Sequence, residues 1–119
     1  MTKTQISKTY DLEERTFNFA KRVNEYVRNL PNTITNFENG KQLTRSAGSV
    51  AANYIEANEA LSKKDFVMRI KICCKEAKES RLWLNLAVPT SDMEDERTAL
   101  VSEVTELMKI FGSILEKSK

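Results

Sequence analysis

Histidine is absent from this 119-residue sequence, and glycine, proline and cysteine are scarce. Without an imidazole, the chain has no histidine base, no Ser-His or Cys-His nucleophile and no histidine ligand for a metal ion. The composition therefore excludes the many enzyme classes whose chemistry depends on this side chain.

Three glycines and two prolines argue against a turn-rich β protein. The two cysteines, Cys73 and Cys74, are adjacent, and this spacing strains a mutual disulfide, so we expect both to be reduced. No run approaches the roughly 20 apolar residues that span a membrane, and the first residues contain no apolar signal core. These absences predict a cytoplasmic, helical protein of one domain with no membrane partner.

Apolar residues at helical spacing are abundant. Residues 42–59 carry an apolar stripe in steps of four and three, bordered by a second, polar stripe. The same spacing is sustained longest in residues 63–87. Its members there are Phe66, Ile70, Cys73, Ala77, Ser80, Leu84 and Ala87.

Four such segments predict four helices, over residues 12–29, 39–60, 63–87 and 92–117. Because the connections are short, the fold class we predict is all-α, an antiparallel up-down four-helix bundle. The bundle domain covers residues 11–119 and follows a flexible N-terminal leader, residues 1–10.

Polar residues before the helices predict their N-caps. Ser62 precedes the third helix, with Asp65 three residues later in the manner of a capping box. We expect Phe37, in the first connection, to fold back onto the core. The candidate caps of the second and fourth helices are Asn36 or Asn39, and Ser91 or Asp92.

The sequence contains more apolar residues than one narrow four-helix core requires. This surplus predicts a second buried face, and therefore a homo-oligomer. The residues outside the principal stripes are Ile55, Val67, Ile72, Leu82, Trp83, Leu86, Val101, Met108 and Ile110.

Two runs, QLTRSAGSVAANYIEA and SKKDFVMRIKICCKEAKESRLWLNLA, resemble the bacterial four helix bundle family, also called the 23S ribosomal RNA intervening-sequence proteins. The resemblance covers residues 10–117. It implies a left-handed up-down bundle that assembles as a homopentamer, with some members encoded inside insertions of ribosomal RNA genes. A related branch binds a reverse transcriptase and nucleic acid through a strongly basic surface, whereas the net charge here is only +2.

The polar stripe has a structural and a functional interpretation. In the structural one, which we favour, Arg45 pairs with a carboxylate of the third helix, either Glu76 or Glu79, and the amide and hydroxyl groups satisfy buried partners. In the functional one, the same groups line a groove that contacts a ligand or RNA. The members of the stripe and its border are Gln42, Arg45, Ser46, Ser49, Asn53 and Glu56.

Charge is unevenly distributed, with a net +4 over residues 63–88 and a net −3 over residues 89–119. This asymmetry indicates either pairing between neighbouring helices or a basic face that meets a polyanion. Lysines on one side of the third helix are the candidate nucleic-acid contacts, since such a line can follow phosphates. They are Lys64, Lys71, Lys75 and Lys78.

No pattern indicates a catalytic, metal or cofactor site, because a di-metal bundle needs Glu-x-x-His motifs. Our first hypothesis is a non-enzymatic oligomeric interaction or scaffold module whose partner is another copy of itself. The second is an accessory protein that associates with nucleic acid, linked to rRNA or a reverse transcriptase. Its partner would be RNA or an RNA-processing protein.

Overall fold

Four long α-helices make up the part of the chain that the computed structural model describes, the backbone of residues 3–119 and the side chains of residues 12–119. Residues 3–119 contain no β-strand, so the all-α prediction is confirmed. The helices are α1 (Lys3–Arg28), α2 (Ile34–Asn58), α3 (Lys63–Leu86) and α4 (Glu94–Lys117), with a short 3-10 turn, η1 (Ser91–Met93), before α4.

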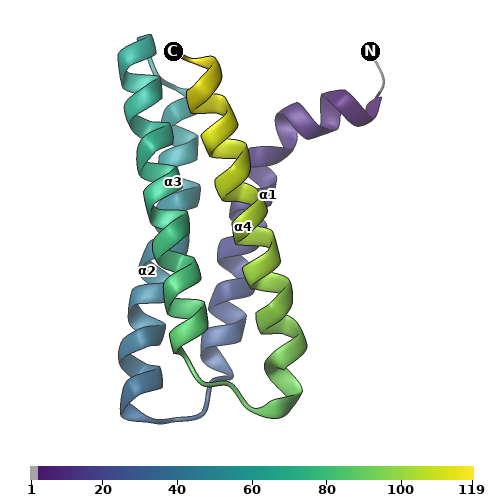
Figure 1. Ribbon diagram of the computed structural model, residues 1–119, viewed down its shortest axis with the longest axis vertical. Coiled ribbons are helices and arrows are strands. Elements are labelled where there is room, and N and C mark those ends of the chain that lie inside the picture. Colours follow the sequence, from purple (N-terminus) through teal and green to yellow (C-terminus); the bar gives the residue numbers. More distant parts are fainter. Residues whose placement is uncertain (1–2) are drawn as a thin grey trace.

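The helices lie side by side as a bundle, with α3 and α4 in front of α1 and α2 in the view of Figure 1. α1 packs on α2, α2 on α3 and α3 on α4, and α4 contacts α1. The α1–α2 and α3–α4 connections share one end of the bundle, whereas the α2–α3 turn and the C-terminus lie at the other end (Figure 1). The α1–α2 side of the bundle is therefore opposite the α3–α4 side.

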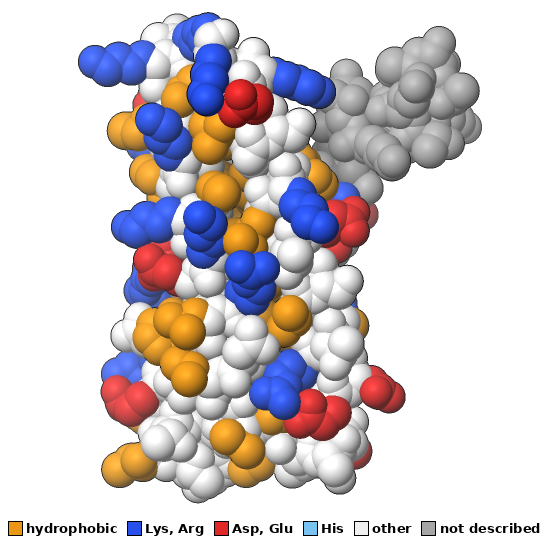
Figure 2. Space-filling view, in the orientation of Figure 1, with side chains coloured by type: hydrophobic (Ala, Val, Ile, Leu, Met, Phe, Trp, Pro, Cys, Tyr) orange, Lys and Arg blue, Asp and Glu red, His pale blue; other side chains and the backbone are white. Residues whose placement is uncertain are grey.

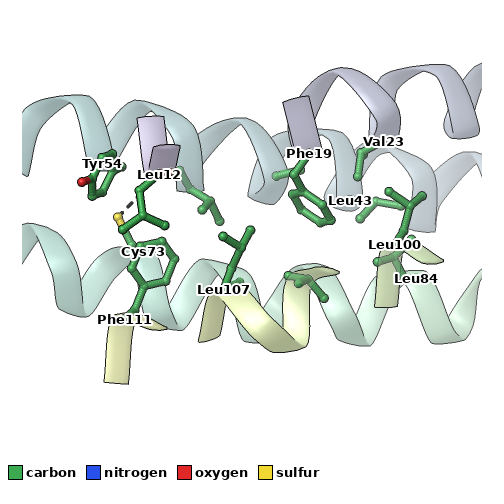
Figure 3. Packing of buried hydrophobic residues seen from close by; sticks show 14 of the residues in the cluster. Leu12, Phe19, Val23, Leu43, Tyr54, Cys73, Leu84, Leu100, Leu107 and Phe111 are labelled. Carbon is green, nitrogen blue, oxygen red and sulfur yellow. Dashed lines mark hydrogen bonds between the residues drawn. The ribbon is translucent and has the colours of Figure 1, made fainter. Parts of the chain in front are cut away.

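The core is built from the apolar stripes that the sequence predicts. Side chains from all four helices converge in it (Figure 3), and the rings of Tyr54 and Phe111 lie 6.3 Å apart between centroids. Each fully buried large side chain stabilises the fold by about 1.5–3 kcal/mol. The largest of them are Phe19, Leu43, Ile70, Leu84, Leu100, Leu107 and Phe111.

Cys73 is a core residue, as expected, and both cysteines are free thiols. Its Sγ donates to the backbone oxygen of Val50 at 3.6 Å, and burial raises the pKa of the thiol to about 12. A thiol with so high a pKa carries almost no thiolate at neutral pH. Cys73 is therefore a packing residue with no nucleophilic character.

The start of α2 differs from the prediction. The helix begins at Ile34 instead of residue 39, and its N-cap is Thr33, not Asn36 or Asn39. The Thr33 Oγ1 atom accepts a hydrogen bond from the backbone N–H of Asn36 at 3.2 Å, which satisfies one of the free donors of the first turn. Asn39 lies within the helix.

Of the N-caps predicted for α3 and α4, only that of α3 agrees with the structure. Ser62 caps α3 as predicted, because its hydroxyl oxygen accepts from the backbone N–H of Asp65 at 3.1 Å. Before α4, however, Ser91 and Asp92 form part of η1, and Met93 is the residue that precedes the helix. The predicted caps at Ser91 or Asp92 are therefore wrong, since a 3-10 turn occupies these positions.

Two predictions at chain ends and connections also need correction. Phe37 does not fold back onto the core, because its side chain is 61% exposed. Leu61, which continues the apolar spacing of residues 42–59, is fully exposed beyond the end of α2. α1 begins at Lys3, earlier than the expected residue 12. The predicted leader, residues 1–10, falls outside the residues whose side chains are described.

Asn36 links the two connections at one end of the bundle. Its Nδ2 atom donates to the backbone oxygens of Pro31 and Val88, at 3.1 and 2.9 Å. Its Oδ1 atom accepts from the backbone N–H of Val88 at 2.8 Å. This buried amide therefore joins the α1–α2 connection to the segment between α3 and α4.

Candidate functional site

Arg45 of α2 lies between two carboxylates of α3. Its Nη2 atom is 3.2 Å from Glu76 Oε1 and 3.0 Å from Glu79 Oε1, and its Nε atom donates to Gln42 Oε1 at 3.5 Å. The Arg45 side chain is 51% exposed, whereas that of Glu76 is only 9% exposed. The guanidinium therefore covers a nearly buried carboxylate from the outside.

Two buried hydroxyls meet directly beneath this ion pair. The Oγ atoms of Ser46 and Ser80 are 2.8 Å apart, and each also lies within hydrogen-bond distance of a backbone oxygen of its own helix, that of Leu43 for Ser46 and that of Glu76 for Ser80. Ser80 Oγ donates to the backbone oxygen of Glu76 at 2.9 Å. The serines are thus satisfied inside the α2–α3 interface, where their hydroxyls bond to each other and to backbone oxygens.

The remainder of the stripe is engaged by Arg69 of α3, a basic residue that stands among lysines in the sequence. Arg69 Nη1 donates to Asn53 Oδ1 at 3.0 Å, and Asn53 Nδ2 donates to Ser49 Oγ at 3.1 Å. Glu56 lies 4.0 Å from Arg69 Nη2. Arg69 therefore faces α2, and the signal that could have revealed it is its position four residues before the buried Cys73.

The four candidate lysines lie on the solvent side of α3, and all are exposed. Within residues 12–119, no carboxylate oxygen lies within 4 Å of Lys64, Lys71, Lys75 or Lys78. Three of these lysines line a shallow hollow of about 460 Å³ between α3 and α4, together with Glu79. Figure 2 shows this face, where Lys and Arg side chains gather over α3 and α4.

Pairing between a basic third and an acidic fourth helix, one of the two interpretations of the charge pattern, does not account for these lysines. Three carboxylates of α4 pair with α1 instead. Arg15 meets Glu103 at 2.8 Å and Glu106 at 3.1 Å. Arg22 is 3.1 Å from Glu96. The hydrogen bonds that Arg15 donates to Glu103 are the main cause of the raised pKa of its guanidinium. Ion pairs therefore bridge α1 and α4, and the lysines of α3 remain available.

Comparison with known proteins agrees with this architecture. The sequence pattern of the 23S rRNA-intervening sequence protein family matches residues 8–113. This chain belongs to that family. No curated protein matches the sequence.

An intervening-sequence protein fold is also supported by a solved structure. The chain is similar to a protein of unknown function from the S23 ribosomal protein family of Bacteroides thetaiotaomicron, whose crystal structure superimposes with a TM-score of 0.77. The two are 31% identical, and the match covers 87% of this chain and 97% of the other. The similarity thus extends over the whole bundle and brings no assigned activity.

Among the described residues, no group of three or more cysteine, aspartate and glutamate side chains converges as a metal site would require. None of the helices, over the residues described, has a run long and apolar enough to cross a bilayer.

The ion pair between Arg45 and Glu76 yields a stability prediction. Arg45→Ala should lower the free energy of unfolding by about 1–2 kcal/mol, because the Glu76 carboxylate loses its partner while remaining nearly buried. The loss should fall short of the 3–5 kcal/mol typical of a fully buried pair, since Arg45 is half exposed and solvent screens the interaction. Urea unfolding at fixed protein concentration measures it.

A double-mutant cycle tests the cause of this loss. In the Arg45→Ala background, Glu76→Gln should restore part of the stability, because it removes the unpaired charge and keeps the shape. Arg28→Ala is the control, as Arg28 pairs with Glu25 on the exposed surface and should change stability by less than about 0.5 kcal/mol. Unchanged unfolding of Arg45→Ala would show that the arginine is free to serve a ligand.

Proposed function

We propose that this chain is a non-enzymatic, oligomeric four-helix-bundle protein that acts as an interaction or scaffold module. The proposed subunit is a left-handed, antiparallel up-down bundle, and the assembly is a homo-oligomer, a homopentamer by resemblance to its family. The observation that carries the proposal is that the side chains of the polar stripe of α2 bond to partners within the same chain. Arg45 meets Glu76 and Glu79, and Ser46 meets Ser80.

Exposed apolar side chains support assembly. Several large apolar residues remain exposed on the bundle, and their burial against another copy would stabilise an assembly. They include Phe17, Phe37, Ile55, Met68, Leu82, Leu86 and Val88.

Light scattering tests this proposal. At micromolar concentration we expect a molar mass that is a whole multiple of 13.6 kDa, and five times that mass for the homopentamer. A mass of 13.6 kDa would refute the proposed assembly. The absence of activity against phosphoester, ester and peptide substrates is the corresponding expectation for a protein without catalytic residues.

A second candidate function, nucleic-acid association, is favoured by one specific observation. Lys64, Lys71, Lys75 and Lys78 share a solvent-exposed side of α3 and have no carboxylate within 4 Å among the described side chains. Each lysine that neutralises a phosphate releases counterions, so the affinity would fall steeply as salt rises. The partner would be RNA or an RNA-processing complex.

A salt titration with rRNA fragments distinguishes this candidate from the first. Lys71→Ala/Lys75→Ala should lower the slope of log affinity against log salt by about 1.5–2 if both lysines contact phosphates. Lys21→Ala/Lys41→Ala, which removes the same charge from the α1–α2 side, should leave the slope unchanged. Equal slopes for both variants would remove the support for this second function.

A further inference from the structure

Two hollows of opposite charge lie between α1 and α2, one toward each end of the bundle. The hollow nearer the α2–α3 turn has a volume of about 750 Å³, and its only charged lining residues are Glu13 and Glu14. The hollow nearer the α1–α2 connection has a volume of about 510 Å³, and its only charged lining residues are Arg28 and Lys41. We call them the acidic hollow and the basic hollow. Exposed apolar side chains line both, Phe17 and Ile55 in the acidic hollow and Phe37 in the basic one.

One stripe of α2 connects the two hollows. Its members follow one another at steps of four, three, four, three, four and three from Phe37 to Asn58, so they share one side of the helix. Gly48 is the central member, and each of the other six lines one of the hollows. The six are Phe37, Lys41 and Thr44 in the basic hollow, and Ala51, Ile55 and Asn58 in the acidic hollow.

Gly48 marks the midpoint between the hollows. Lys41 precedes it by seven residues and Ile55 follows it by seven, so each lies two helical turns, about 10.5 Å, away along the axis. Gly48 is exposed and has open space where a Cβ atom would stand, and glycine is a poor helix former. Packing within the bundle does not require a glycine here. Its lack of a side chain instead allows another backbone to approach α2 closely at this point.

α1 runs along the stripe in the opposite direction and places its charges at matching heights. Glu13 Oε1 accepts a hydrogen bond from Asn58 Nδ2 at 3.1 Å, near the end of α2. At the other end, a Cβ atom on Gly40 would lie only 3.1 Å from Val27 Cγ1. The carboxylates and the basic groups therefore stand at similar distances above and below Gly48.

We infer that the α1–α2 face binds the same face of a second copy of this chain, turned end over end about a two-fold axis at Gly48. This rotation places the acidic hollow of each copy on the basic hollow of the other, so the same contact is made twice. Glu13 and Glu14 face Arg28 and Lys41 of the second copy.

The inference rests on the proposed homo-oligomer and adds the symmetry of one contact and the face that forms it. By itself, a two-fold contact closes on two copies. Where head-to-tail contacts through other faces close a ring, this contact joins subunits of two rings. A pair of chains is therefore the unit to detect, whatever the total number of copies.

Charge favours this orientation over a parallel one. In a parallel pair, the acidic hollows would face each other and the basic hollows would face each other, and like charges in contact disfavour association. Lys41 has no carboxylate within 4 Å among the side chains of residues 12–119. Arg28 pairs with Glu25 of its own helix at 2.7 Å, and its side chain is 70% exposed. Both basic groups can therefore be reached by a second copy.

A cysteine on the proposed axis tests the contact. A residue on a two-fold axis meets its own counterpart, so most chains of Gly48→Cys should become disulfide-linked pairs on a non-reducing gel after mild oxidation. Gly112→Cys is the matched control, because Gly112 of α4 is also exposed with open space where a Cβ atom would stand. This control and the wild type, with its own Cys73 and Cys74, should remain single chains.

Cysteines two turns from the axis test the direction of the second copy. Lys41→Cys and Ile55→Cys, mixed in equal amounts and allowed to exchange subunits, should link to each other, because the rotation exchanges these two heights. Each variant alone should link several-fold less. In a parallel pair, each variant would link to itself instead.

Charge reversal tests the complementarity at exposed residues, where substitutions leave the core intact. In the Gly48→Cys background, Glu13→Lys/Glu14→Lys and Arg28→Glu/Lys41→Glu should each slow the linking by at least about tenfold, because all facing groups then carry one sign. The variant with all four substitutions has opposite charges at the contact again. It should link as fast as Gly48→Cys alone, as should an equimolar mixture of the two double variants.

The remaining outcomes contradict the inference in distinct ways. If the wild type is oligomeric in light scattering and Gly48→Cys stays unlinked, the assembly stands and this face is not its contact. Equal linking of Gly112→Cys would mean that the pairs arise from random collisions. Linking of Lys41→Cys to itself as fast as in the mixture would show parallel copies. A wild-type mass of 13.6 kDa would refute the proposed assembly, and this contact with it.

Discussion

Phe111→Ala is expected to lower the free energy of unfolding by about 3–5 kcal/mol, the largest loss of any substitution considered for this protein. Phe111 of α4 is fully buried, and its ring packs beside that of Tyr54 of α2. Removal of the ring leaves a cavity that helices held on several sides cannot fill. The measurement is urea unfolding followed by circular dichroism at one fixed protein concentration, because assembly couples to stability.

Phe37→Ala provides the matched control. The same ring is removed, but Phe37 is 61% exposed, and the Nζ atom of Lys41 lies 5.5 Å from its ring centroid. We expect a loss below about 1 kcal/mol. Similar losses for the two variants would mean that Phe37 does fold onto the core, as the sequence suggested, and that its exposed position is wrong.

The helical seams could be predicted from the sequence because a buried stripe repeats with the period of the helix. In α3, six of the seven predicted positions are fully buried or nearly so, from Ile70 to Ala87. The signal is strong there because every turn of the helix repeats it. Leu61 shows the limit of the method, since it continues the stripe of α2 in register but follows the end of the helix.

Helix ends were less predictable, because they depend on single hydrogen bonds among several equivalent polar residues. Thr33, Asn36 and Asn39 are all acceptable caps by residue type. Only the three-dimensional path of the chain shows that Thr33 bonds to the first turn while Asn36 reaches the other connection. No local pattern distinguishes these two roles.

The candidate site was also predictable only in part from the sequence. The spacing of the polar stripe indicated that Arg45 faces α3. It could not decide whether Glu76 or Glu79 is the partner of Arg45, because both carboxylates pair with this arginine. The contact of Arg69 with Asn53 was missed, because a basic residue that stands among lysines carries no local sign that it turns toward α2. The net charge of each segment did not reveal which helices form ion pairs, since Glu96, Glu103 and Glu106 of α4 meet arginines of α1.

Asn36→Ala is expected to lower the free energy of unfolding by about 2–3 kcal/mol, far more than a cap or a surface amide would. The substitution removes three hydrogen bonds and leaves the N–H of Val88 and the backbone oxygens of Pro31 and Val88 without partners. Each such group costs about 1–3 kcal/mol when it stays buried, and water at the end of the bundle recovers part of this cost. Thermal and urea unfolding both measure the loss.

Asn32→Ala separates this bridge from a general effect on the connection. Asn32 belongs to the same connection and is exposed, so its loss should change stability by less than about 0.5 kcal/mol. Thr33→Ala removes only the cap and should cost about 1 kcal/mol. If Asn36→Ala costs no more than Thr33→Ala, the amide is replaceable by water. The two connections would then be held together by the packing of the helices alone.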